Sequence, residues 1–98
     1  MLEFSFIATL WMSSGQGAWH FVTVPLDFTE PLRAAGGPRA GFGAVPVTAQ
    51  LGQVVWKTSV FPDASSGCFF LPVKRAVRER NDVEAGDEVA VTLRVVMA

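Results

Sequence analysis

The sequence predicts an all-β domain in which six strands and two short helices form one small barrel. Three observations support this prediction. Apolar and polar residues alternate in separate stretches, which is typical of strands with one buried face. The order strand, strand, helix, strand occurs twice along the chain. The chain has 98 residues, of which 50% are hydrophobic, and a mean hydropathy of +0.34, so we expect a single packed domain over residues 1–98.

The first predicted strand covers residues 2–11. Its apolar residues share one face, while Glu3 and Ser5 lie on the other. A secretory signal peptide needs basic residues followed by a continuous apolar run, and this stretch has neither. No apolar run approaches the roughly 20 residues of a membrane helix. We therefore expect a cytoplasmic chain, and the lone cysteine, Cys68, agrees with this location.

The other strands are predicted from the same alternation and from the turn residues between them. Pro25 ends the second strand, because proline cannot donate a ladder hydrogen bond. Pro46 places the third strand at an edge, or at a position where the missing N–H faces outward. Gly52 and Gln53 form the turn that follows. These strands are expected over residues 18–24, 43–51, 54–61, 68–71 and 89–95.

Two short helices follow prolines. In the first, Thr29 is the expected N-cap, Pro31 lies in the first turn, and residues 36–38 (Gly-Gly-Pro) end it. The second helix is expected to open at Pro72. Val73, Ala76 and Val77 then form one buried stripe at helical spacing, and residues 81–82 (Asn-Asp) end the helix.

The two halves of the chain share their order of elements. Pro25 and Pro72 are 47 residues apart, close to half the length of the chain. This order predicts a duplicated unit whose six strands close into a barrel with a helix over each end. Closure would also remove the exposed sheet edges of an apolar chain.

An ordered set of residues resembles the DUF1905 family, and the resemblance covers nearly the whole chain. It implies a double-split β-barrel of two ββαβ halves, similar in fold to AbrB/MazE-like domains. It implies no established activity or DNA-binding role, and members often occur beside a bacteriocin-protection type domain. The residues that carry the resemblance are Phe21, Val24-Pro25, Gly43, Val45, Val47, Trp56-Lys57-Thr58-Ser59, Phe61-Pro62, Gly67, Leu71-Pro72-Val73-Lys74, Arg78, Gly86-Asp87, Val89, Val91 and Leu93.

A basic group in the second half is the candidate binding site. The candidate residues are Lys57, Ser59, Lys74 and Arg78. Converging cations could hold a phosphate or carboxylate, and the residues beside Lys57 could add an aromatic wall and a hydroxyl donor. The alternative is a solvated helix face whose partners are Glu79, Asp82 and Glu84. Eight basic and nine acidic residues give a net charge of −1, which disfavours a protein that coats nucleic acid by bulk charge.

Other chemistry has little support in the sequence. One cysteine and one histidine exclude an internal disulfide and a thiolate zinc site, so we expect no metal and no cofactor. His20, Ser59 and Asp87 have the residue types of a hydrolytic triad, but no Gly-x-Ser-x-Gly motif accompanies them. We interpret Asp87 as a turn residue and Cys68 as a buried thiol. The three tryptophans, Trp11, Trp19 and Trp56, are expected in the core or at the barrel mouth.

These observations favour a non-enzymatic binding or interaction module for an anionic ligand or a protein partner. A nucleic-acid-binding domain is the alternative by fold analogy alone. An enzyme acting on a small anionic substrate is the third hypothesis, and it lacks an acid or base beside the cations. A second copy of the chain stays open as a partner.

Overall fold

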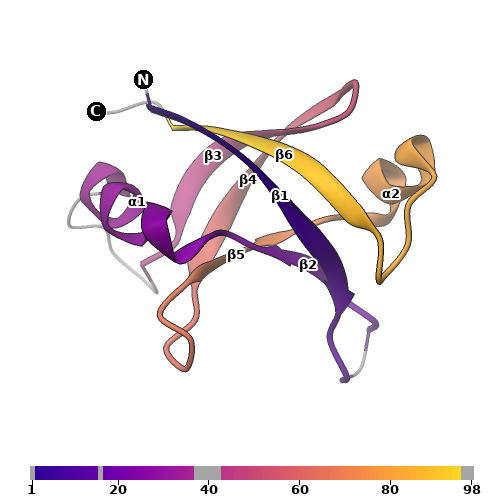
Figure 1. Ribbon diagram of the computed structural model, residues 1–98, viewed down its shortest axis with the longest axis horizontal. Helices are drawn as coiled ribbons and strands as arrows, with labels where there is room; N and C mark the ends of the chain where they lie inside the picture. Colours follow the sequence, from indigo (N-terminus) through magenta and orange to yellow (C-terminus); the bar gives the residue numbers. More distant parts are fainter. Residues whose placement is uncertain (1, 16, 37–42, 96–98) are drawn as a thin grey trace.

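The computed structural model describes residues 2–15, 17–36 and 43–95. In this part of the chain, six strands form a closed antiparallel barrel in the order β1-β2-β5-β4-β3-β6, with α1 and α2 at opposite ends (Figure 1). The predicted fold class is confirmed. None of the described helices is long and apolar enough to cross a membrane. The strands are β1 (Leu2–Met12), β2 (His20–Thr23), β3 (Val45–Leu51), β4 (Val54–Pro62), β5 (Phe69–Pro72) and β6 (Glu88–Val95).

Two long strands change partner along their length. β1 pairs with β6 over residues 2–9 and with β2 over residues 10–12. β4 pairs with β3 over residues 54–60 and with β5 only at Phe61 and Pro62. The barrel is therefore split in two places, between β1 and β2 and between β4 and β5.

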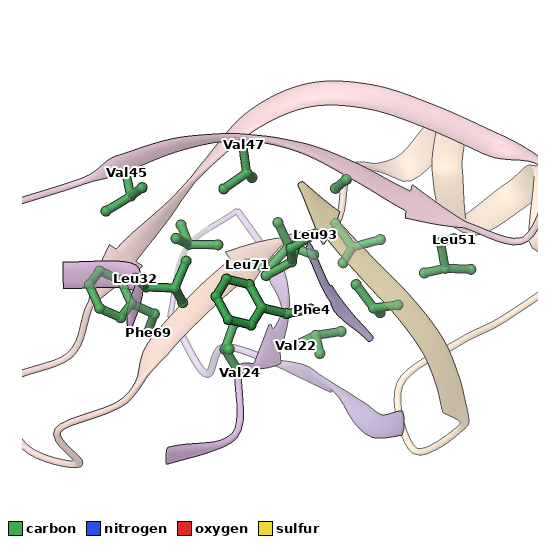
Figure 2. Packing of buried hydrophobic residues seen from close by; sticks show 14 of the residues in the cluster. Phe4, Val22, Val24, Leu32, Val45, Val47, Leu51, Phe69, Leu71 and Leu93 are labelled. Carbon is green, nitrogen blue, oxygen red and sulfur yellow. The ribbon is translucent and has the colours of Figure 1, made fainter. Parts of the chain in front are cut away.

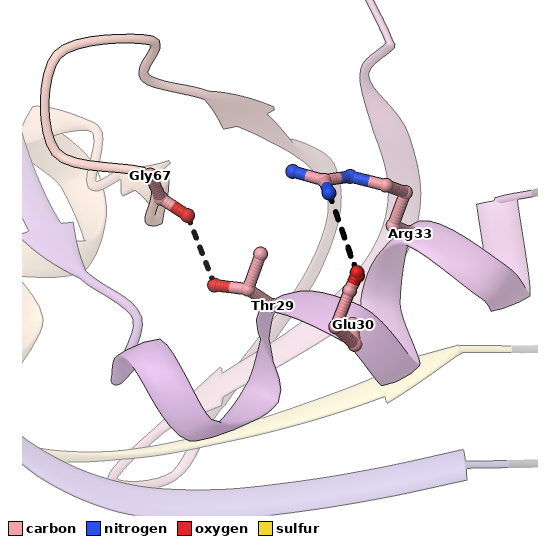
Figure 3. Close-up of polar contacts among 4 residues, drawn as sticks. All are labelled: Thr29, Glu30, Arg33 and Gly67. Carbon is pink, nitrogen blue, oxygen red and sulfur yellow. Dashed lines mark hydrogen bonds and ion pairs between the residues drawn. The ribbon is translucent and has the colours of Figure 1, made fainter.

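The first helical segment differs from the prediction at its start. A 3-10 helix (Leu26–Phe28) precedes α1 (Thr29–Gly36). Thr29 is not the N-cap as predicted, because its own backbone is helical, with φ −61° and ψ −51°. Its Oγ1 instead donates to the carbonyl oxygen of Gly67 at 3.1 Å (Figure 3). This hydrogen bond ties α1 to the β4–β5 loop. The predicted stop signal at residues 37–38 lies outside the described residues.

Pro46 lies where β3 has one neighbour. β3 pairs with β4 along its whole length, but with β6 only from Thr48 to Leu51. At Pro46 β3 is therefore an edge strand, and from Thr48 onward it lies between two strands. The missing N–H of Pro46 thus leaves no hydrogen bond unmade between strands.

The second helix begins three residues later than predicted. Pro72 is the last residue of β5, and α2 runs over Arg75–Asn81 with Lys74 as N-cap. Val73 precedes the helix, and its N–H donates to the carbonyl oxygen of His20 at 2.9 Å. Val73 and Val77 are buried as predicted, but Ala76 is exposed. Ala76 was predicted to be buried because it follows Val73 by three residues, which is helical spacing. Val73 lies before the helix, so this spacing does not apply, and the prediction was wrong at Ala76.

The core fills the barrel interior (Figure 2). It consists of the inward-facing apolar residues of the strands, including Phe4 and Phe69, closed at the two ends by Leu32 of α1 and Val77 of α2. Leu10, Val22, Leu71 and Leu93 are completely buried. Alternation therefore predicted the buried face of β1, β3 and β6.

A hydrogen-bond pattern reveals how the two halves correspond. Val24 N–H donates to Phe69 O at 2.8 Å, and Val73 N–H donates to His20 O at 2.9 Å. The two bonds are equivalent if residues of the second half follow their counterparts in the first half by 49 positions. Val73 then corresponds to Val24, and Phe69 corresponds to His20. Pro25 therefore corresponds to Lys74. The predicted match of Pro25 with Pro72 was wrong by two residues, although the repeated order of elements is present.

Candidate functional site

A small pocket lies at the split between β4 and β5. From Val54 to Val60, β4 pairs on one side with β3, and no described strand pairs with its other side. The chain leaving β5 at Pro72 runs past this open edge to α2. The resulting pocket, here called the split pocket, has a volume of about 140 Å³. It is lined by Trp19, His20, Trp56, Lys57, Thr58, Pro72, Val73 and Lys74.

The split pocket contains two cations from different elements. Lys57 extends from β4, and Lys74 is the exposed N-cap of α2. They are the only lysines of the chain. Within the described residues neither lysine forms an ion pair. Two unpaired ammonium groups beside one cavity create a positive potential that favours an anion.

Aromatic rings form much of the remaining wall. Trp56 is half-buried and packs against the core. Trp19 is 59% exposed and stacks on Phe21, with ring centroids 6.4 Å apart and an interplanar angle of 13°. Trp19 and Trp11 are exposed, so a position in the core, one of the two places expected for the tryptophans, is wrong for both. The pocket thus combines ammonium groups with flat apolar surfaces.

His20 adds the remaining titratable group. Its Nδ1 lies 2.8 Å from the carbonyl oxygen of Ala18. A carbonyl oxygen can only accept, so Nδ1 carries the hydrogen in this bond. In the neutral imidazole Nε2 is then an acceptor.

The structure separates the four predicted site residues into two groups. Lys57 and Lys74 meet at the split pocket, whereas Ser59 and Arg78 are not among its lining residues. Arg78 is half-buried, and its Nε donates to the carbonyl oxygen of Val73 at 3.3 Å. Arg78 therefore holds the segment that carries Lys74. The neighbouring Arg75 pairs with Glu79 at 2.8 Å, as expected for a solvated helix face.

Trp19 and His20 are lining residues that the sequence reasoning missed. They belong to the first half of the chain, and the pairing of β2 with β5 brings them to the second. One signal was present: alternation places Trp19 and Phe21 together on the face opposite the buried Val22. Two large aromatic residues on a solvent face indicate a contact surface.

The equivalent place in the first half is apolar. In the first half Trp11 of β1 pairs with Phe21 of β2, and in the second half Phe61 of β4 pairs with Phe70 of β5. Phe61 is therefore the counterpart of Trp11, and each β4 residue follows its counterpart in β1 by 50 positions. Ile7 then corresponds to Lys57, and Pro25 to Lys74. Phe28 packs there against Phe4 and Phe6, at centroid distances of 4.9 and 6.0 Å. Both lysines are thus specific to one end of a nearly symmetric barrel.

Val77 takes the place of Phe28 in the second half, 49 positions later. Val77 is buried, and its side chain has two methyl groups where phenylalanine has a ring, so it fills less space. Phe28 packs against Phe4 and Phe6 beside the first split, and the cavity beside Trp56 lies at the second split.

A wider depression of about 800 Å³ lies on the outer face of β1, β6 and β3. It is shallow, and its cation, Arg94, pairs with Glu3 at 3.2 Å. An anion would have to compete with that carboxylate. The split pocket is therefore the better candidate although it is smaller.

The other candidate residues have structural roles. Asp87 Oδ2 accepts a hydrogen bond from the backbone N–H of Glu84 at 2.9 Å, which confirms the turn interpretation. Among the described residues no hydrogen bond joins His20, Ser59 and Asp87 into a triad. Cys68 is half-buried and not buried as predicted, because it lies in the loop before β5.

The β4–β5 loop holds a carboxylate of perturbed acidity. Asp63 accepts hydrogen bonds from Ser66 Oγ at 2.8 Å, Ser65 Oγ at 3.0 Å and the Ser65 N–H at 3.2 Å. The bond from Ser66, followed by those from Ser65, lowers the pKa of Asp63 below its ordinary value. These bonds shape the loop and lie outside the split pocket.

Comparison with known proteins identifies the family. The family model described as "Domain of unknown function (DUF1905)" matches residues 6–93, which is most of the chain. Comparison with the curated proteins gave no match. The observed barrel of two ββαβ halves agrees with the fold that the resemblance implied. The chain belongs to the DUF1905 family.

Proposed function

We propose that this domain is a non-enzymatic binding module that holds an anionic ligand in the split pocket. Lys57 and Lys74 supply the charge, and Trp56 and Trp19 supply the apolar walls. The observation that carries the proposal is the convergence of both lysines of the chain, from separate elements and without carboxylate partners in the described residues, on one cavity.

The size of the split pocket limits the ligand. Its volume of about 140 Å³ is close to that of an engineered cavity of about 150 Å³ that accepts benzene. One ring or one branched side chain therefore fits, together with a carboxylate or phosphate at the lysines. Most ligand sites have this composition of apolar walls and a few fixed polar groups.

Catalysis is supported less well than binding. His20 places one potential base at the pocket, which the sequence reasoning did not foresee. A hydrolase or transferase would also need an activated nucleophile or a second acid in contact with it. The other polar lining residues are Thr58 and the two lysines, and no hydrogen bond in the described residues connects them to His20.

The first experiment follows ligand binding at the two lysines. Selective isotope labelling of lysine gives only two side-chain signals by NMR, those of Lys57 and Lys74. Benzoate, acetate and inorganic phosphate are titrated at low salt. We expect benzoate to shift both signals at low millimolar concentration, and to shift them more than acetate does at equal concentration.

Two double variants each remove two positive charges, one pair at the split pocket and one pair away from it. Lys57→Gln with Lys74→Gln should abolish benzoate binding, read from backbone amide shifts of Trp19 and Thr58. Arg33→Gln with Arg80→Gln removes two charges elsewhere and should leave the binding unchanged. If no anion shifts either lysine, or if the control pair loses binding equally, the proposed function is wrong.

A further inference from the structure

Five aromatic side chains form a continuous surface on the outside of the barrel. Ring centroids lie 4.9 Å apart for Trp11 and Phe21, and 4.9 Å apart for Phe21 and Phe70. Phe61 lies 5.9 Å from Phe70, and Trp19 stacks on Phe21. We call this surface, which consists of Trp11, Trp19, Phe21, Phe61 and Phe70, the aromatic face.

Two rings of the aromatic face are exposed, and the other three, Phe21, Phe61 and Phe70, are half-buried. Trp11 is 38% exposed and Trp19 59% exposed. The indole Nε1 of Trp11 donates to Thr23 Oγ1 at 2.9 Å, which fixes the ring on the surface. The residues that alternate with these rings, such as Val22 and Leu71, already fill the core. The rings therefore have no packing role inside the barrel, and a contiguous, partly exposed aromatic surface indicates a partner.

Trp19 joins the aromatic face to the split pocket. Its ring stacks on Phe21 and also lines the pocket beside Lys57 and Lys74. A partner on the face would therefore reach two unpaired ammonium groups at one end. Charge complementarity then requires a negative group at one end of an otherwise apolar partner.

The extent of the aromatic face selects a polymer over a small molecule. It crosses β1, β2, β5 and β4, and neighbouring strands lie about 4.8 Å apart, so it spans roughly 14 Å. An extended peptide of about four or five residues covers that distance. A nucleic acid strand carries a phosphate at every nucleotide and needs cations along its whole path. The two lysines of the chain lie together at the split pocket, and the net charge is −1.

We propose that the split pocket and the aromatic face together bind the carboxyl-terminal segment of a partner protein, a proposal that rests on the proposed function. The terminal carboxylate lies between Lys57 and Lys74. The terminal apolar side chain enters the pocket against Trp56 and Val73, and the preceding residues cross the aromatic face. A terminal residue suits a mostly apolar pocket with two ammonium groups, because its carboxylate and its side chain share one carbon atom.

The test uses a pool of acetylated hexapeptides that end in Leu, Ile, Val or Phe and carry aromatic residues at earlier positions. Each is made as the free acid and as the carboxyl-terminal amide. We expect the free acids to shift the amide signals of Trp19, Phe21 and Phe70. The amides should bind at least about tenfold more weakly, because they lose a charge-assisted hydrogen bond.

Two variants separate the aromatic face from the split pocket. Trp11→Thr changes the face but no lining residue, so it should weaken peptide binding at least about fivefold and leave benzoate binding unchanged. Ile7→Thr is the matched control, because Ile7 is 68% exposed on β1 but lies outside the aromatic face. It should change neither.

Each outcome has a distinct meaning. Benzoate binding without binding of any peptide overturns this inference and leaves the proposed function intact, whereas the absence of both overturns both. Equal affinity of acids and amides overturns the role of the terminal carboxylate. A single-stranded oligonucleotide that binds where no peptide does overturns the inference in favour of nucleic acid. Self-association that Trp11→Thr abolishes, again without peptide binding, shows that a second copy covers the face.

Discussion

Gly52 and Asn81 meet where the turn between β3 and β4 passes the end of α2. Gly52 has a φ of +61°, as the first position of a type II′ turn requires. Asn81 Nδ2 donates to the carbonyl oxygens of Leu51 at 3.1 Å and Val77 at 2.9 Å, which ties the helix end to the turn. A Cβ at Gly52 would overlap Asn81 Oδ1. One turn residue thus fixes both the hairpin and the position of α2.

We predict that Gly52→Ala lowers the free energy of unfolding by about 1–3 kcal/mol, through backbone strain and displacement of Asn81. Urea denaturation measures the change. Gly15→Ala is the control, because Gly15 has no heavy atom closer than 3.9 Å to an added Cβ. When Asn81 is also replaced by Ala, the added Cβ no longer meets the Asn81 side chain. Gly52→Ala should then lower the free energy of unfolding only by the backbone strain at position 52. A Gly52→Ala protein as stable as the native chain would contradict the packing described here.

At the scale of elements, α2 covers one end of the barrel with a single buried residue. Val77 is 1% exposed, whereas the adjacent Ala76 is exposed. We predict that Val77→Asp lowers the free energy of unfolding by about 3–5 kcal/mol, the cost of an unpaired buried charge, and therefore lowers the melting temperature by roughly 12–40 °C. Circular dichroism at neutral pH measures the folded fraction.

Ala76→Asp is the matched substitution on the other face of the same helix. Its carboxylate would lie in water, so the melting temperature should stay within a few degrees of the native value. If Ala76→Asp proved as damaging as Val77→Asp, the orientation of α2 would be wrong.

The strands could be predicted from the sequence more closely than the helix starts. Alternation has a period of two residues, so it identified the more buried face of β1 from Leu2 to Leu10. Proline gave less certain information, because it is favourable both at a helix start and at a strand end. Pro72 ends β5 in register with Phe21, and the hydrogen bond of Val73 to His20 shows that the chain is still extended one residue later.

The candidate site could be predicted in part. The lysines were evident from their charge, but sequence spacing could not show that Arg78 bonds to its own segment while Lys74 faces the pocket. Trp19 and His20 reach the site through the pairing of β2 with β5, which depends on register across the two halves. A single sequence carries the alternation of each strand but not the choice of its neighbour.

At the scale of the whole molecule, the two halves are interleaved. Within residues 1–52 the structure has a single ladder, between β1 and β2, and within residues 53–98 a single short one, between β4 and β5, both counted over the described residues. The ladders of β1 with β6, β2 with β5, and β3 with β4 and β6 all join the halves. The core is likewise shared, since Leu10 and Val22 pack in one cluster with Leu71 and Leu93.

This interleaving predicts that neither half folds alone. A fragment of residues 1–52 keeps one hairpin and the unpaired β3, and an isolated two-stranded hairpin is at best marginally stable in water. We expect far-UV circular dichroism of each fragment to show an unfolded chain. An equimolar mixture should regain the strand signal, because cutting between Gly52 and Gln53 removes one turn but leaves every ladder available. A fragment of residues 1–52 that melts cooperatively by itself would show that the duplicated unit is a folding unit, and that the barrel is an association of two independent halves.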